Sequence, residues 1–208
     1  MLVLIQRGGP VMGIIILLAL VAAVIIIERL IFFRKIQVDE EKMINRLKAT
    51  LEKGHYDEAV SICENNPAPI TNLMKVGIEH RAYSEQTMKE SIVAAANMEI
   101  PRLERFLSLL GTIAHISPLL GLLGTVIGMI RAFGVLGAGP TTDPSLLSRG
   151  IAIALLSTAA GITVAMPTIG FYNYLISKVN HIIIRLENRV GDMVLLLIKK
   201  DSDLVREK

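Results

Sequence analysis

Three long apolar runs constrain this chain more than any other feature of its sequence. Residues 11–27 are apolar without interruption, residues 106–130 contain His115 as their one ionisable side chain before Arg131, and residues 151–176 contain no acidic or basic residue. Because an α-helix rises 1.5 Å per residue, about 20 such residues cross the hydrocarbon core of a membrane. With a mean hydropathy of +0.53, the chain is predicted to be an all-α integral membrane protein with three transmembrane helices.

Basic residues near the ends of these runs predict the orientation, because cytoplasmic loops are enriched in Lys and Arg. They gather after the first run, before the second and after the third (Arg29, Arg34, Lys35, Arg102, Arg105, Lys178, Arg185 and Arg189). The N-terminus is therefore expected outside and the C-terminus in the cytoplasm. The predicted order is an outer N-terminal segment at 1–9, spans at 10–33, 106–136 and 148–177, an outer loop at 137–147, and cytoplasmic parts at 34–105 and 178–208.

The two cytoplasmic parts carry helical periodicity. Gly54 is expected to end one helix as its C-cap, and the Pro-containing residues 65–69 to separate two others. No glycine interrupts residues 84–110, which predicts one long helix that continues into the second span, with a bend near Pro101. The third span is expected to extend in the same way through residues 178–208.

Small and hydroxyl-bearing residues form one stripe on each of the second and third spans. Residues spaced by four, seven, eight and eleven positions share a helix face. In span two these are Ser117, Gly121, Gly124, Thr125 and Gly128, and in span three they are Gly150, Ala154, Ser157, Thr158, Gly161 and Ala165. Small residues let helices approach closely in lipid, which predicts packing along these faces. The hydroxyls either bond to their own helix carbonyls or line a polar path for an ion.

Three further residues of the hairpin each permit two interpretations. Pro118 and Pro167 remove backbone hydrogen bonds, and each marks either a hinge or a static kink. His115 has a reference pKa that suits a proton relay near the cytoplasmic side. Its other interpretation is an interfacial histidine with a backbone or water partner.

A charged cluster stands just before span two, formed by Glu99, Arg102, Glu104 and Arg105. It is either a cytoplasmic vestibule in an oligomer or a solvated helix face with a Glu99–Arg102 pair. The sequence contains no metal-ligand spacing, nucleophile motif or phosphate loop. We therefore expect no enzyme activity, no cofactor, no bound metal and no nucleic-acid partner.

Two segments resemble the MotA/TolQ/ExbB family, and ExbB/TolQ more closely than MotA: "TIAHISPLLGLLGTVIGMIRAF" and "GIAIALLSTAAGITVAMPTIGFYN". The resemblance implies a multi-pass protein of the bacterial inner membrane with a periplasmic N-terminus. It implies a homo-pentamer whose second and third spans surround a lumen, with Thr125 and Thr158 facing it. It also implies an ExbD/TolR-like single-span partner and a TonB- or TolA-like transducer, so that proton or sodium flow energises an outer-membrane process.

One departure from the family pattern concerns charge. Some ExbB and TolQ members have a glutamate at the position of Ile153, five residues before Thr158. Since this hairpin has no carboxylate, the ion-carrying group is expected to be a membrane aspartate of the partner. Two alternatives remain open at this stage: a membrane scaffold without ion flux, and a relative of flagellar stators.

Overall fold

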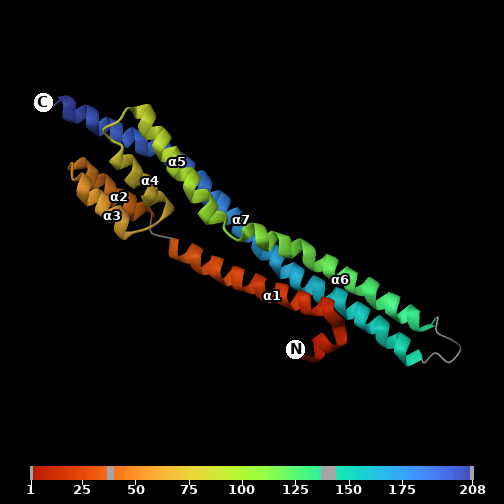
Figure 1. Cartoon of the computed structure of the whole chain (residues 1–208). Helices are drawn as coiled ribbons and strands as arrows, with labels where there is room; N and C mark the ends of the chain where they lie inside the picture. Colours follow the sequence, from red (N-terminus) through yellow and green to blue (C-terminus); the bar gives the residue numbers. More distant parts are fainter. Residues whose placement is uncertain (1, 37–39, 137–143, 207–208) are drawn as a thin grey trace. The chain divides into compact units, whose positions relative to one another are not determined.

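The computed structural model describes residues 2–36, 40–136 and 144–206, and all regular elements in these ranges are α-helices (Figure 1). They are α1 Leu2–Ile36, α2 Glu40–Glu52, α3 Tyr56–Asn65, α4 Pro69–Glu79, α5 Glu85–Glu104, α6 Leu107–Leu136 and α7 Pro144–Arg206. The all-α fold predicted from the sequence is thus confirmed. Gly54 follows α2 with a φ of +78°, the left-handed conformation that glycine adopts without strain.

Three helical stretches are long and apolar enough to cross a membrane. They cover Pro10–Ile36, Glu85–Gly134 and Leu147–Arg189, and each contains one of the apolar runs in the sequence. The prediction of three membrane-spanning helices is confirmed by length and composition. The predicted outer loop at 137–147 lies mostly outside the described residues.

The chain forms two compact units. The first, here called the hairpin unit, contains residues 1–29 and 106–176, and the second, here called the charged unit, contains residues 30–105 and 177–208. The hairpin unit holds α6 with most of α1 and the first half of α7. The charged unit holds α2, α3, α4 and α5 with the remaining parts of α1 and α7.

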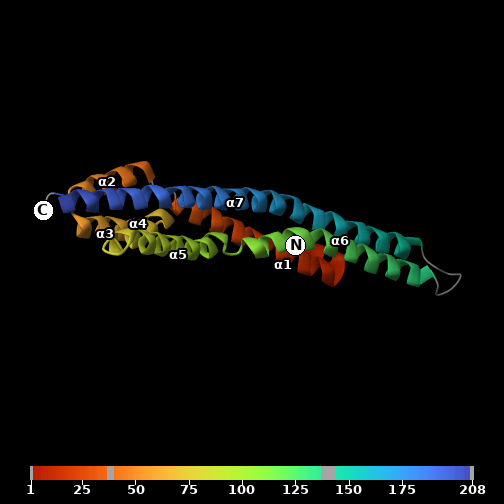
Figure 2. The ribbon, with the colours of Figure 1, turned by 90° about the horizontal axis from the view of Figure 1, so that it is seen from above.

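Within the hairpin unit, α6 and the first half of α7 run side by side (Figures 1 and 2). Glycines set their separation. A Cβ atom added at Gly161 would lie 2.5 Å from the carbonyl oxygen of Ser117, and one added at Gly128 would lie 2.7 Å from the Cβ of Ala154. These distances are shorter than any van der Waals contact allows, so a larger residue would force the two backbones apart.

The same close approach continues along the contact between α6 and α7, here called the seam. A Cβ at Gly121 would lie 3.0 Å from the Cα of Thr158, and one at Gly124 would lie 2.6 Å from the Cβ of Ser157. Gly124 also faces α1, because Cγ1 of Val11 lies 3.4 Å from the same position. The small residues of both stripes are therefore in contact with each other inside one chain.

The connection between α5 and α6 differs from the expected continuous helix. Pro101 lies inside α5 without ending it, whereas the helix is interrupted at Arg105 and Phe106. Phe106 has a φ of +64°, a left-handed conformation that costs a residue with a Cβ about 1–2 kcal/mol. The extension of α7 to Arg206, in contrast, is uninterrupted, as predicted.

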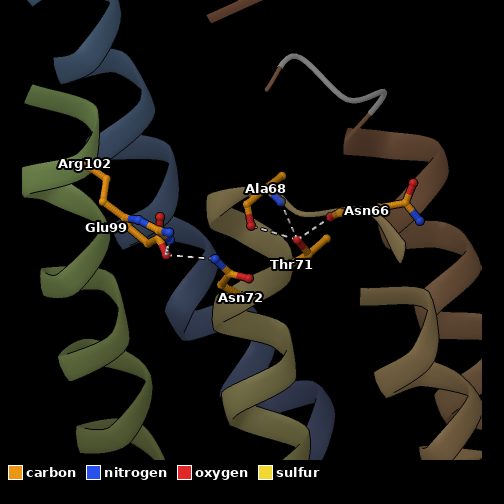
Figure 3. A network of polar contacts seen from close by, with 6 residues as sticks. All are labelled: Asn66, Ala68, Thr71, Asn72, Glu99 and Arg102. Carbon is orange, nitrogen blue, oxygen red and sulfur yellow. Dashed lines mark hydrogen bonds and ion pairs between the residues drawn. The ribbon is translucent and has the colours of Figure 1, made fainter. Parts of the chain in front are cut away.

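In the charged unit, Thr71 fixes the start of α4 (Figure 3). Its side-chain oxygen accepts a hydrogen bond of 2.9 Å from the backbone amide of Ala68 and lies 2.7 Å from the carbonyl oxygens of Asn66 and Ala68. This is the N3 half of a capping arrangement, with Pro69 at the first helical position. Because Thr71 is buried, its hydroxyl replaces the water that would otherwise satisfy these groups.

Glu99 ties α5 to α4 in the same unit (Figure 3). Its Oε1 accepts hydrogen bonds from the Asn72 side chain, at 2.8 Å, and from the Arg102 guanidinium, at 3.2 Å. Glu99 is only 8% exposed, whereas Arg102 extends into solvent. The predicted Glu99–Arg102 pair is therefore present, and Asn72 adds a contact between helices.

The contact between α3 and α4 combines a polar bond at the surface with buried side chains between the helices. Nζ of Lys75 donates to Oε1 of Glu64 over 2.6 Å, and this bond raises the pKa of the Lys75 ammonium group. The neighbouring Cys63 is a free thiol, and burial raises its pKa to about 11. Its thiolate fraction at neutral pH is consequently very small.

The seam of the hairpin predicts the effect of adding one methyl group to it. Replacing Gly161 by alanine should destabilise the protein by about 1–3 kcal/mol, because the new Cβ meets the Ser117 carbonyl oxygen. Gly170 is the matched control, since a Cβ there meets no atom within 4 Å. Thermal unfolding of both variants in detergent, followed by far-UV circular dichroism, should show a lower midpoint only for G161A. Equal midpoints for the two variants would contradict the observed seam.

The buried carboxylate predicts a second stability difference. Replacing Glu99 by alanine should cost about 1–3 kcal/mol, because the Asn72 amide loses its partner at a site with little access to water. Replacing the exposed Glu104 on the same helix should change stability by less than about 0.5 kcal/mol. Thermal midpoints of E99A and E104A provide the comparison, and a loss of stability in E104A alone would refute the assigned role of Glu99.

Candidate functional site

The two threonines of the small-residue stripes meet at one backbone carbonyl. Oγ1 of Thr125, on α6, lies 3.1 Å from the carbonyl oxygen of Gly121, and Oγ1 of Thr158, on α7, lies 3.0 Å from the same atom. The two hydroxyls also contact each other. Both threonines are half-buried. The hairpin therefore brings three oxygen atoms together from two helices.

The two threonine hydroxyls and the Gly121 carbonyl oxygen are here called the oxygen group. The number of hydrogens that they carry limits what the group can do chemically. Each threonine hydroxyl supplies one hydrogen, whereas the Gly121 carbonyl supplies none. Two hydrogens can fill at most two of the three contacts at one time, either both at the Gly121 carbonyl or one there and one between the threonines. Lone pairs remain on the oxygens. Such a group can accept a hydrogen bond from water or a proton carrier, or ligate a hard cation such as sodium, but it cannot hold a charge itself.

Ser157 occupies a different environment from its neighbour Thr158. It is buried against Gly124, and its hydroxyl donates to the carbonyl oxygen of Ile153 on its own helix over 3.1 Å. Ser117 likewise donates to the carbonyl of Ile113 over 2.7 Å. Both serines thus follow the local, backbone-bonded alternative.

The remaining small residues of the two stripes line the seam. Ala154 and Ala165 are buried, and a Cβ on Gly150 would lie 2.8 Å from the Cβ of Ala132. Their environment is the opposite helix of the same chain. A role in a lumen wall between chains stays a prediction.

His115 lies on the exposed side of α6, away from the oxygen group. Its Nδ1 is 2.7 Å from the carbonyl oxygen of Gly111, an atom that can only accept, so the hydrogen is assigned to Nδ1. Nε2 then carries the lone pair of the neutral ring. Ten residues separate His115 from Thr125, which is roughly 15 Å along the helix. The two side chains are therefore not part of one cluster.

The two prolines lie inside continuous helices. Pro118 is half-buried in α6 and Pro167 is exposed on α7. Each proline leaves the carbonyl four residues earlier, at Ala114 and Thr163, without a helical donor. Both helices continue through these positions, and the choice between hinge and kink stays open.

The charged cluster before span two belongs to the charged unit. Glu99 is directed at Asn72 and Arg102, as described above, while Glu104 and Arg105 are exposed. Among the described residues, no group of three His, Cys, Asp or Glu side chains could hold a metal ion. A vestibule formed by this cluster stays a prediction.

One charged contact has no counterpart among the sequence predictions. Arg29 on α1 is 2% exposed, donates to both carboxylate oxygens of Glu28 over 2.5 and 2.6 Å, and has its Cζ atom 5.8 Å from the ring centroid of Phe106. The sequence signal for this contact is the pair of opposite charges, Glu28 and Arg29, that follows the first apolar run. That pattern does not identify the aromatic partner, which is 77 residues later in the sequence (106 − 29).

Comparison with known proteins places this geometry in a family. Residues 65–188 match the model of the MotA/TolQ/ExbB proton channel family. A putative biopolymer transport protein, ExbB-like 1, from Synechocystis sp. is 33% identical over 82% of this chain and 68% of its own length. ExbB-like 3 from the same organism is 29% identical over 74% of this chain and 75% of its own length.

A shorter match extends to a second branch. The Tol-Pal system protein TolQ of Haemophilus influenzae is 37% identical over 42% of this chain and 39% of its own length. The chain thus spans roughly two thirds to three quarters of these ExbB-like relatives and a much smaller part of TolQ. The family match covers more than half of the chain, including all of α6 and α7 as far as residue 188. The chain belongs to the MotA/TolQ/ExbB proton channel family.

Proposed function

We propose that this chain is the multi-pass subunit of an ion-driven motor in the bacterial inner membrane. The observation that carries the proposal is the meeting of the Thr125 and Thr158 hydroxyls at the Gly121 carbonyl. This contact joins polar side chains of α6 and α7, whereas the hydroxyls of Ser117, Ser157 and Thr163 donate to carbonyl oxygens of their own helix. Family membership and the three apolar helices support the same conclusion.

The ion-carrying charge is assigned to a partner. Residues 106–136 and 144–177 contain no Asp or Glu, and position 153 is an isoleucine. Threonine oxygens can pass on a proton or ligate sodium but cannot hold the charge between steps. The partner is therefore an ExbD/TolR-like protein whose single membrane helix supplies an aspartate, and the threonines escort the ion.

The proposed assembly follows the family pattern. Copies of this chain, five in the proposal, surround the partner helices, with N-termini in the periplasm and C-termini in the cytoplasm. A TonB- or TolA-like protein transmits the resulting motion to an outer-membrane process. His115 is proposed as an additional proton relay, because its Nε2 lone pair lies on the exposed side of α6.

A non-conducting scaffold is the second candidate. The observation that favours it is the local satisfaction of the same threonines, since each hydroxyl has a partner inside the hairpin. In a scaffold these contacts would only hold α6 to α7. A measurement of ion flux distinguishes the motor from the scaffold, because the scaffold conducts no ions.

Ion flux through paired threonine variants tests the proposal. Thr125→Val and Thr158→Val remove a hydroxyl with little change in shape, and each should lower flux at least tenfold in vesicles that contain the chain and its partner. Thr112→Val and Thr163→Val are matched controls on the same two helices, because these exposed threonines donate to carbonyls of their own helix, those of Ser108 and Ala159. The controls should retain flux within about twofold.

Three results would contradict separate parts of the proposal. Wild-type flux in the doubly substituted T125V/T158V chain would remove the threonines from the ion path. An absence of flux in the wild-type complex, with normal assembly by size-exclusion chromatography, would favour the scaffold. Persistent flux with a partner whose membrane aspartate is replaced by asparagine would show that the charge carrier is elsewhere.

A further inference from the structure

We propose that the contact between Phe33 and Lys178 binds the headgroup phosphate of an anionic phospholipid from the surrounding bilayer. Lys178 and Arg34 supply the positive charge, and the Phe33 ring holds the Lys178 ammonium group in place. The ligand is thus a phosphodiester with a net negative charge that is carried on acyl chains. All three residues belong to the charged unit, and the binding is independent of the proposed ion transport.

The contact joins residues at the ends of two predicted spans. Phe33 is the last residue of the first span, and Lys178 directly follows the third. Nζ of Lys178 lies 5.7 Å from the centroid of the Phe33 ring, within the range of a cation–π interaction. The contact therefore brings the two span ends to the same level of the molecule. Phospholipid headgroups surround a membrane protein at the level where its spans end.

The positive charge at this contact is not neutralised within the charged unit. Lys178 is half-buried, and the Phe33 ring against which it lies is 2% exposed. Among the residues that the structure describes, neither Lys178 nor Arg34 forms an ion pair with a carboxylate. Glu28, the acidic residue of α1, is bonded to Arg29. A cation that is partly removed from water and lacks a counter-ion favours an anion from outside the chain.

The residues next to Phe33 suit a lipid phosphate. Arg34 is exposed, and its Cα lies about 3.8 Å from that of Phe33 because the two are adjacent in the sequence. A guanidinium group binds two phosphate oxygens through parallel N–H donors, and an ammonium group adds a point charge. Ile31 is 60% exposed and lies three residues before Arg34, on the same side of the helix. It offers the acyl chains an apolar surface beside the cations, which a free phosphate ion does not need.

Native mass spectrometry of the full-length protein in detergent, titrated with phosphatidylglycerol, tests the site. Each cation near an anionic headgroup strengthens binding about fivefold. K178Q and R34Q should therefore each weaken the tightest phosphatidylglycerol binding about fivefold, and the double variant about 25-fold. K178R should keep the wild-type affinity, because it retains a cation at the Phe33 ring. Phosphatidylcholine has no net charge and should bind more weakly, with an affinity that these substitutions leave unchanged.

Two exposed cations elsewhere in the chain provide matched controls. Lys89 lies on α5, and Arg131 lies on α6, directly after the second apolar run. K89Q and R131Q each remove one positive charge, as K178Q does, and both should keep the affinity for phosphatidylglycerol within about twofold. An equal loss of affinity in R131Q and K178Q would reduce the effect to a general attraction at span ends and would overturn the site.

Three further results would overturn the assignment. Wild-type affinity in the K178Q/R34Q chain would show that these cations do not hold the headgroup. Displacement of the lipid by an excess of inorganic phosphate would assign the site to a free anion, and equally tight binding of phosphatidylcholine would remove the role of net charge. If K178Q does not fold, as judged by far-UV circular dichroism, R34Q decides the question, and wild-type affinity in R34Q would then overturn the proposal.

Discussion

The contact between α6 and α7 at backbone distance is the interaction on which the rest of the hairpin depends. Without side chains at Gly121 and Gly161, the Ser117 carbonyl can lie against α7, and Thr158 can reach the Gly121 carbonyl of the opposite helix. In a bilayer, aliphatic side chains gain nothing by leaving lipid for another apolar surface, so close packing and interhelical hydrogen bonds must hold such helices together. The seam supplies both.

The distribution of side-chain size follows from this requirement. Bulky residues of α6 and α7 are largely exposed on the outside of the hairpin, among them Leu119, Ile130, Leu155 and Met166. Glycine, alanine and serine occupy the inside. The polar group at Thr125 and Thr158 therefore lies at the edge of a tightly packed seam. Helices held this closely keep the threonine oxygens in fixed positions, which suits repeated contact with a small ion and equally suits a static support.

The sequence could predict the helices and their faces but only part of their contacts. The lengths of the apolar runs predicted the three spans, and a spacing of three to four residues predicted that Gly121, Gly128 and Thr125 share one helix face. Periodicity does not give the register of two helices, so the shared Gly121 carbonyl could not be predicted. The break at Phe106 was missed for a related reason: it has no local stop signal, and Arg29 approaches it from a distant part of the chain.

An engineered disulfide measures most directly whether the small-residue stripes close the hairpin of one chain. A Cβ at Gly150 would lie 2.8 Å from the Cβ of Ala132, which is within about 1 Å of the ~3.8 Å typical of a disulfide. In a chain with A132C, G150C and C63A, oxidation should consume both thiols while the protein still migrates as a monomer on a non-reducing gel. Oxidation to a covalent dimer, with no crosslinked monomer, would show that the stripes face a neighbouring chain and would contradict the seam.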